Sequence, residues 1–310
     1  MKKIAVFFDQ PDFDDYPFDE EEYYKAYHEF AAIIAEKGGA FFITRGDATY
    51  LGGMRFRSGW RWSGEQFEKT DEEFQVDVIY DKSKSALTPP FRFESETKVL
   101  NPNPIVEICN DKFKTHTLFE EISPQITLAL DDKQLKKAVR ETPGKKMVMK
   151  PLNQEGGEGV VIGDADKLKS TDKDFPVLVQ EFIDTSGGIP KVTGIDSHHD
   201  FRMVVIDGEI IQCFARTPPE GSLTANVAQG GESHEIPLAK IPAGARELAE
   251  KIDEKFVSYR RVYSIDVGFD ENGTPKLIEL NSQPGLFSQE RGKQFAEFQK
   301  KLADVLLGFN

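Results

Sequence analysis

Two carboxylates, Asp266 and Glu279, are predicted to face each other across a β-hairpin near the C-terminus. Between them, Asn272 and Gly273 form the preferred pair for a two-residue type I′ turn, and this register places the two acids directly opposite each other. Like charges at opposed positions repel, unless a cation lies between them. Carboxylate oxygens suit Mg²⁺ or Mn²⁺, which complete their shells with water and phosphate oxygens. The alternative is an ordinary hairpin whose acidic face is solvated.

Side-chain alternation then divides this hairpin into two faces. The polar face carries Asp266, Glu279 and Asn281, which are the candidate metal ligands. The other face is expected to be core and carries Ile265, Val267, Ile278 and Leu280.

A glycine-rich loop over 156–159 follows the apolar segment that ends at Lys150. Glycines let backbone N–H groups approach phosphate oxygens, and Lys150 would add a positive charge at the base of the loop. The loop is not a Walker A motif, because no Gly-Lys-Ser/Thr sequence leads into a helix. A flexible hairpin with no ligand is the alternative.

Two arginines, Arg202 and Arg216, lie on consecutive strands joined at Asp207 and Gly208. Arginines beside a metal site are what a transferring phosphoryl group or an acyl phosphate requires. A strict two-residue turn would oppose Arg216 to His199 and place the two arginines on opposite faces. Both can point to one face only if a β-bulge intervenes.

The elements that must position these residues are of two kinds: a strand–helix–strand segment, and a later segment of closely spaced strands. Residues 4–8, 20–37 and 40–44 are expected to form a strand, a helix and a parallel strand, with a further strand at 77–80. A helix capped by Asn110 or Asp111 comes next, followed by strands at 146–150, 160–162, 177–182, 201–206 and 209–215. The segment from Tyr50 to Trp62 is rich in aromatic and arginine residues. It is expected to be a decorated hairpin or a surface loop, and contact with a substrate or partner is the alternative.

The bulk composition excludes several classes of protein. The 310 residues carry a net charge of −14, which argues against binding a nucleic-acid backbone. The two cysteines form neither a metal-ligand cluster nor a disulfide pattern. The apolar run at the N-terminus is too short to span a membrane, so no membrane partner and a cytoplasmic location are expected.

Motifs in a fixed order make the chain resemble the ATP-grasp superfamily, in its RimK-type and glutathione-synthetase-like branch. The motifs that carry the resemblance are Asn110-Asp111-Lys112, Met149-Lys150-Pro151 with its glycine loop, Gln180-Glu181-Phe182-Ile183, Asp200-Phe201-Arg202, Asn226, Asp266, and Glu279-Leu280-Asn281. The resemblance covers roughly residues 100–290. It implies an α/β and α+β fold: an ATP-grasp fold with an N-terminal Rossmann-like, or pre-ATP-grasp, domain at 1–105. A small lid subdomain at 106–185 and a C-terminal subdomain at 186–310 that carries the metal site would follow.

The resemblance also assigns roles to individual residues. The nucleotide, ATP, would contact Lys112, Lys150, the loop glycines Gly156, Gly157 and Gly159, the hinge residues Gln180, Glu181, Phe182 and Ile183, and Asp200 near the ribose. Mg²⁺ or Mn²⁺ would be held by Asp266, Glu279 and Asn281. The catalytic residues would be Arg202, Arg216 and Asn226. His198 and His199 lie in a connection longer than the family pattern. A solvated loop is the expectation for them, and contact with substrate is the alternative.

The activity that the resemblance implies is ligation of a carboxylate to an amine through an acyl phosphate, with release of ADP and phosphate. The substrates would be small-molecule or peptide carboxylates and amines. Family members often form dimers or tetramers, so a homo-oligomer is an expectation that the resemblance alone supplies. Two alternatives stay open: a kinase on the same scaffold that phosphorylates a hydroxyl, and a non-catalytic ATP-binding module. The intact metal and arginine set argues against the module.

Overall fold

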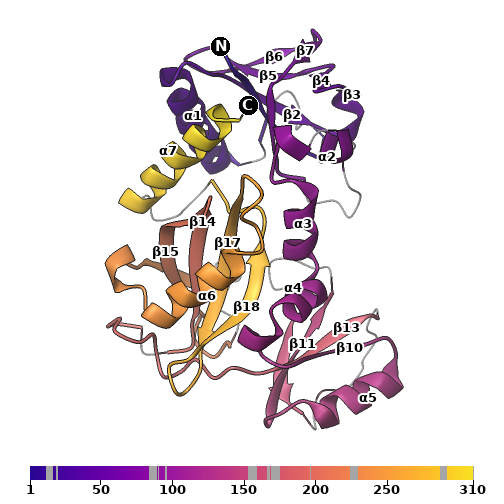
Figure 1. Cartoon of the computed structure of the whole chain (residues 1–310), viewed down its shortest axis with the longest axis vertical. Helices are drawn as coiled ribbons and strands as arrows, with labels where there is room; N and C mark the ends of the chain where they lie inside the picture. The colour runs from indigo at the N-terminus through magenta and orange to yellow at the C-terminus, as the bar shows by residue number, and fades with distance from the viewer. Residues whose placement is uncertain are drawn as a thin grey trace. The chain divides into compact units, whose positions relative to one another are not determined.

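The computed structural model describes every residue except 12–16, 19, 84–88, 90, 95, 153–158, 166–167, 169–174, 196, 224–229, 287–291 and 310. Within it the chain forms two compact units (Figure 1). The first comprises Met1–Val106, Val257–Tyr263 and Ser282–Asn310, and the second comprises Glu107–Phe256 and Ser264–Asn281. The division into 1–105, 106–185 and 186–310 stays a prediction. By its packing, the C-terminal helix belongs to the first unit.

The first unit is built on a six-stranded sheet in the order β6-β5-β2-β1-β8-β9. Strand β1 pairs in parallel with β2 and with β8, so the predicted strand–helix–strand unit is confirmed. The elements of this unit are β1 Lys3–Phe8, α1 Glu21–Glu36, β2 Ala40–Arg45, β3 Tyr50–Gly52, β4 Arg55–Phe56, β5 Gly59–Trp62, β6 Phe67–Thr70, β7 Phe74–Gln75, β8 Val78–Asp81, α2 Phe91–Glu94, β9 Val99–Leu100 and α7 Lys293–Leu307. Helix α3, Asn103–Asn110, begins in this unit and ends in the second.

The sheet of the first unit is covered on both faces. One face carries α1, whose buried residues include Tyr27 and Phe30, and α7 packs on α1, where Gln299 donates to the Ala26 carbonyl. The other face packs against the small sheet β3-β4-β7 and α2, in a cluster that includes Phe7, Phe56 and Phe91. Alternation along β1 supplies both layers, as expected for a buried strand.

The segment from Tyr50 to Trp62 belongs mainly to this core. Trp60 and Trp62 on β5 are buried, whereas Arg55, Arg57 and Arg61 are exposed. Strands β5 and β6 pair antiparallel, so the hairpin interpretation is confirmed and the aromatic residues are explained by packing.

The second unit contains two antiparallel sheets, in the orders β10-β13-β11-β12 and β16-β15-β14-β17-β18. Helix α5 packs on the first of these sheets through a cluster that includes Leu135, Met147 and Met149. The elements are α4 Lys112–Leu118, β10 Ile126–Ala129, α5 Asp132–Glu141, β11 Lys146–Pro151, β12 Val161–Asp164, β13 Val177–Glu181, β14 Asp200–Ile206, β15 Glu209–Thr217, β16 Glu232–Glu235, α6 Ala243–Asp253, β17 Val262–Phe269 and β18 Pro275–Asn281.

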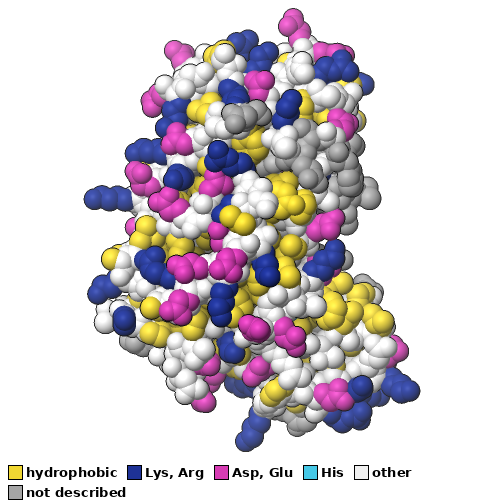
Figure 2. All heavy atoms as spheres, viewed as in Figure 1, with side chains coloured by type: hydrophobic (Ala, Val, Ile, Leu, Met, Phe, Trp, Pro, Cys, Tyr) yellow, Lys and Arg dark blue, Asp and Glu magenta, His cyan; other side chains and the backbone are white. Residues whose placement is uncertain are grey.

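On the face drawn in Figure 2, the Lys and Arg side chains are interspersed with Asp and Glu side chains. Among the described residues, no helix has the length and apolar character needed to cross a bilayer.

Asn101 joins three separate segments of the first unit. Its amide nitrogen donates to the carbonyl oxygens of Val262 and Ser282, at 2.5 and 2.6 Å, and its side-chain oxygen accepts from the Val262 N–H at 2.8 Å. The side chain is buried, so water cannot replace these contacts.

Replacement of Asn101 by alanine is expected to lower the free energy of unfolding by about 2–4 kcal/mol, because it removes three hydrogen bonds to buried backbone groups of Val262 and Ser282. Urea denaturation checks this, with Asn272→Ala, at an exposed turn position, as the control. A loss no larger than in the control would contradict the role given to Asn101.

Candidate functional site

Asp266 and Glu279 lie opposite each other in the β17–β18 pair, as predicted. The route to this register differs from the predicted one. The turn has a three-residue loop, in which Asp270 N–H donates to Thr274 O at 3.0 Å and Gly273 has a positive φ of 72°. Such a loop combines a type I turn with a residue in the left-handed region, which glycine adopts without strain.

A β-bulge at Ile278 then restores the register. Val267 pairs with Leu277 but Asp266 pairs with Glu279, so Ile278 is the extra residue of β18. The prediction that Ile278 lies on the core face is therefore wrong. Leu277 is buried in its place, while Ile278 is only half-buried and approaches Gly268, where an added Cβ would lie 3.5 Å from its Cδ1 atom.

A second bulge brings the two arginines to one face. The turn at Asp207 is two residues long, since Ile206 pairs with Glu209, but the register shifts between Val204 and Val205. Arg216 consequently pairs with Asp200, and the register that opposed it to His199 is corrected. Because side chains alternate, Asp200, Arg202 and Arg216 share a face.

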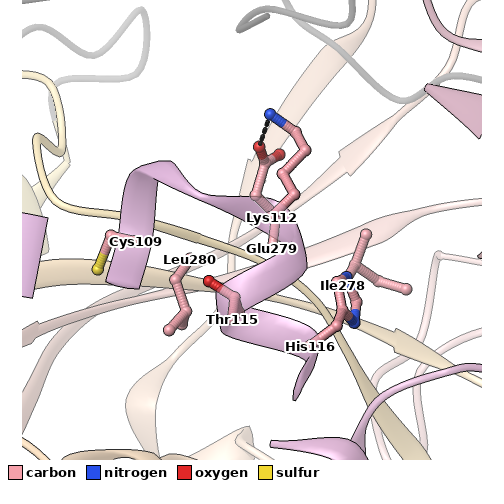
Figure 3. A pocket seen from close by; sticks show the side chains of 7 residues that line it. All are labelled: Cys109, Lys112, Thr115, His116, Ile278, Glu279 and Leu280. Carbon is pink, nitrogen blue, oxygen red and sulfur yellow. Dashed lines mark ion pairs between the residues drawn. The ribbon is translucent and has the colours of Figure 1, made fainter. Parts of the chain in front are cut away.

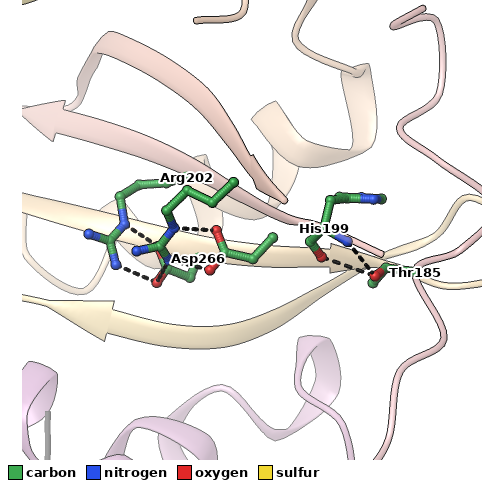
Figure 4. A network of polar contacts seen from close by, with 6 residues as sticks. Thr185, His199, Arg202 and Asp266 are labelled. Atoms are coloured by element: carbon green, nitrogen blue, oxygen red, sulfur yellow. Dashed lines mark hydrogen bonds and ion pairs between the residues drawn. The ribbon is translucent and has the colours of Figure 1, made fainter. Parts of the chain in front are cut away.

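These side chains form one network with Asp266 (Figure 4). Arg202 donates to both oxygens of Asp266, at 2.6 Å each, and Arg216 donates to Asp266 Oδ2 at 2.8 Å. Arg216 also makes a bidentate contact with Asp200, including 2.9 Å from Nε to Oδ1. Two guanidinium groups thus offset the charge of two neighbouring carboxylates.

The network shifts the pKa values of its two acids in opposite directions. Burial would raise the pKa of Asp266, but Arg202 and Arg216 outweigh it and hold that pKa below its ordinary value. Burial raises the pKa of Asp200 to about 6; Arg216 opposes this rise and the nearby Asp266 adds to it. Asp266 therefore loses its proton at a lower pH than Asp200 does.

Glu279 has a different cationic partner. Lys112, at the start of α4, places its Nζ 3.1 Å from Glu279 Oε1 (Figure 3). The helix begins there because Asp111 caps it, accepting from the N–H groups of Phe113 and Lys114. Cys109, Thr115, His116 and Leu280 line a small pocket beside this pair. The cap predicted at Asn110 or Asp111 is therefore at Asp111.

Lys150 is buried on β11, and its charge interacts with both Glu279 and Lys112. Strand pairing places Val148 opposite Gln180 and Lys150 opposite Leu178. Lys150 and Gln180 therefore share the face of this sheet that is opposite to the α5 core. Lys112, Lys150 and Glu279, all identified from the sequence, come together.

The hinge residues at the end of β13 make specific contacts. The Glu181 N–H donates to the Gln125 carbonyl at 2.9 Å, and its carboxylate accepts from the Gln125 N–H at 3.2 Å. The ring of Phe182 lies under Lys146 Nζ, 5.8 Å away. Ile183 approaches Gly268, where an added Cβ would lie 3.6 Å from its Cγ2 atom. The hinge therefore reaches the same strand that carries Asp266.

His199 is buried, which corrects the expectation of a solvated pair. The backbone N–H of His199 donates to the Thr185 hydroxyl, and this hydroxyl donates to the backbone carbonyl of His199, both at 3.0 Å. His198 is half-buried, with Nδ1 3.7 Å from Asp184. Gly159 is described as an exposed turn residue, whereas Gly156, Gly157 and Asn226 lie outside the described residues.

The donor atoms at this site are of the chemical type that binds a divalent cation. Asp266 and Glu279 supply carboxylate oxygens from adjacent strands, and Asn281 adds an amide two residues further along β18. Among the described residues no three His, Cys, Asp or Glu side chains cluster, so water and phosphate oxygens would complete the shell, as Mg²⁺ prefers. Both oxygens of Asp266 are engaged by arginine, and a cation would have to take over one of these contacts.

The environment of Lys150 predicts a pH effect on stability. Burial lowers its pKa from 10.5 to about 8; Glu279 opposes this shift and Lys112 adds to it. Between pH 8 and 10.5 the unfolded chain binds this proton more tightly than the folded chain, so the free energy of unfolding rises with pH, by about 3 kcal/mol in total for this group.

Lys150→Met should remove this contribution. The difference in unfolding free energy between wild type and variant, followed by urea denaturation, should shift in favour of the wild type as pH increases from 7 to 10. The exposed Lys114→Met is the matched control. A difference that stays constant with pH would contradict a buried, charged Lys150.

Residues 109–306 match the RimK-like ATP-grasp domain. A probable alpha-L-glutamate ligase of Syntrophotalea carbinolica is 28% identical over 182 residues, which are 56% of this chain and 55% of that protein. The match thus spans a little over half the length of the curated relative.

Solved structures share the fold over the whole chain. The D-alanine–D-alanine ligase of Bacillus anthracis complexed with ATP covers 100% of this chain and 97% of its own, with a TM-score of 0.61 and 15% identity. The RiPP-associated ATP-grasp ligase of Chryseobacterium gregarium, in complex with ADP and a leader and core peptide, has a TM-score of 0.59 and 13% identity, with 99% and 97% covered. The fold predicted from the motifs is confirmed, and the chain belongs to the RimK-like ATP-grasp family.

Proposed function

We propose that this protein is an ATP-dependent carboxylate–amine ligase that forms an amide bond through an acyl phosphate and releases ADP and phosphate. The observation that carries the proposal is the single face shared by Arg202, Arg216 and Asp266, with Glu279 directly opposite Asp266. Such a face combines guanidinium groups for a transferring phosphoryl group with carboxylates for a cation. The family membership and the solved ligases with ATP or ADP support the same activity.

In this proposal the chain's own side chains divide the work by charge. Lys112 and Lys150 offset the negative charge of the ATP phosphates. Arg202 and Arg216 exchange their carboxylate partners for the phosphoryl group and then stabilise the acyl phosphate and the tetrahedral species that follows amine attack. Asp266, Glu279 and Asn281 would hold Mg²⁺, which neutralises phosphate charge when bound. No protein nucleophile is needed.

The nucleotide base would lie beside the hinge. Ile183, Thr185 and Ile278 all approach Gly268, so the side chains present an apolar wall two residues from Asp266 on the same strand. Gln180, Glu181 and Phe182 would complete this wall, and Asp200, bound to Arg216, would lie near the ribose.

The substrates are proposed to be a carboxylate and an amine of amino-acid or peptide type. The curated relative is named a glutamate ligase, and the Chryseobacterium structure contains a peptide. Association of chains into a homo-oligomer stays a prediction.

Glu279→Gln should reduce MgATP-dependent turnover at least a hundredfold while nucleotide binding stays measurable, because the variant removes one anionic ligand and the partner of Lys112. Phosphate release at saturating Mg²⁺ measures this. Glu247→Gln on the exposed side of α6 is the control, and near-normal turnover of Glu279→Gln would refute the metal assignment.

The activity itself is tested by incubating the protein with ATP and mixtures of amino acids and peptides, and then following ADP release and product mass. ADP release that depends on an amine, with a product mass equal to acid plus amine minus water, supports ligation. A stable phosphorylated product formed without an amine would instead support the kinase.

A further inference from the structure

Ser264 carries a buried hydroxyl that the proposed mechanism does not use. It lies on β17, two residues before Asp266, and is 0% exposed. The hydroxyl oxygen makes no hydrogen bond within the part of the chain that the structure describes. A hydroxyl that loses water without gaining a partner is unfavourable, and alanine would fill nearly the same space without this penalty. Packing alone therefore does not explain the hydroxyl of Ser264.

The pairing register places this hydroxyl beside a candidate metal ligand. Ser264 pairs with Asn281, and the register shift of this hairpin comes only after the pair of Asp266 with Glu279. Because side chains alternate, Ser264 and Asn281 lie on the same face as the two acids. Directly opposed residues have Cβ atoms about 4.5–5.5 Å apart, which is within reach of a hydroxyl and an amide.

The side chain of Asn281, unlike a carboxylate, must be oriented in order to bind a cation. Its amide presents an acceptor oxygen on one side and two N–H donors on the other, and a half-turn of the amide exchanges them. Mg²⁺ takes oxygen ligands. A hydroxyl that accepts from the amide nitrogen selects the orientation in which the oxygen faces the cation, as outer contacts do at other metal sites.

The other two candidate ligands already have contacts that hold them. Arg202 donates to both oxygens of Asp266, and Lys112 lies 3.1 Å from Glu279 (Figure 3). Cationic partners suit these carboxylates, whereas a neutral hydroxyl suits a neutral amide. Ser264 is the polar side chain opposite the third candidate ligand, and its hydroxyl needs no open cavity to reach it.

We infer that Ser264 is a positioning residue, whose hydroxyl accepts a hydrogen bond from the Asn281 amide nitrogen and keeps the amide oxygen turned toward the cation. The inference rests on the proposed function, because it requires Asn281 to be a metal ligand. The hydroxyl gains its partner when the amide oxygen turns to the cation. Ser264 itself is not a ligand of the ion.

Mn²⁺ binding measures this role without turnover, because the electron paramagnetic resonance signal of free Mn²⁺ gives the dissociation constant. With saturating ADP, Ser264→Ala should weaken Mn²⁺ binding about tenfold or more. Equal Mn²⁺ affinity in wild type and Ser264→Ala would overturn the inference.

Ser123→Ala is the matched control for this titration. It also removes a buried hydroxyl that has no hydrogen-bond partner among the described residues, but Ser123 lies outside the β17–β18 pair. Its Mn²⁺ affinity should equal that of the wild type. A loss as large as in Ser264→Ala would assign the effect to the removal of any buried hydroxyl and contradict the inference.

A second substitution removes the need for orientation. Asn281→Asp replaces the amide by a carboxylate with two equivalent oxygens, either of which can face the cation. In this background Ser264→Ala should change the Mn²⁺ affinity by less than about twofold. If the loss persists at its full size, the hydroxyl acts on the site in a way that does not involve the amide, and the inference fails.

Thermal unfolding without Mn²⁺ or nucleotide separates this role from a structural one. Ser264→Ala and Ser123→Ala should both unfold at the temperature of the wild type or above it, because each removes an unpaired buried hydroxyl. A lower unfolding temperature for Ser264→Ala alone would show that its hydroxyl stabilises the protein without a cation, and this would overturn the inference.

A crystal structure of the wild type with Mn²⁺ and ADP does not depend on how the variants fold. The anomalous signal of Mn²⁺ locates the ion, and the atom of Asn281 that binds it must be the oxygen, so the orientation of the amide is defined. Ser264 Oγ should then lie within hydrogen-bond distance of Asn281 Nδ2, and any other arrangement would refute the contact. Failure of the wild type to bind Mn²⁺ with ADP would instead refute the proposed function, and the role of Ser264 with it.

Discussion

The pairing register of two antiparallel strand pairs determines which charged side chains meet in the C-terminal sheet. Each hairpin carries one extra residue, at Ile211 in β15 and at Ile278 in β18. Because side chains alternate with a period of two, a single extra residue moves every later side chain to the other face. Without these bulges Arg216 would oppose His199 and Asp266 would oppose Ile278. The whole electrostatic arrangement depends on this local irregularity.

The charges brought together in this way are compensated within the protein. Asp266 is held by two arginines, and the partly exposed Glu279 is held by Lys112, so these acids and bases are paired. A buried charge that loses its partner is strongly destabilising. A cation that exchanges one anionic partner for another stays paired, so this cost does not arise. The charges of this arrangement are therefore compensated within the protein itself.

Much of the fold and of the candidate site could be predicted from the sequence, because local patterns of residues determine them. Helix α1 and the parallel pair β1–β2 follow from hydrophobic periodicity, and the acid pair follows from its position around Asn272-Gly273. The pair was correct although the turn was one residue longer than predicted, because the bulge at Ile278 offset that error. A β-bulge leaves no local signal in a mostly apolar run such as 210–215. The face of the sheet on which Arg216 lies could therefore not be derived from the sequence.

The first unit is discontinuous along the chain. Residues 257–263 and 282–310 complete it, Lys2 donates to the Leu307 carbonyl, and Lys37 lies 2.6 Å from Asp304. On the ribosome, the N-terminal hundred residues therefore emerge long before the helix that covers α1. The apolar surface of these residues stays partly uncovered until residues 282–310 have been translated, so the second unit can finish folding before the first.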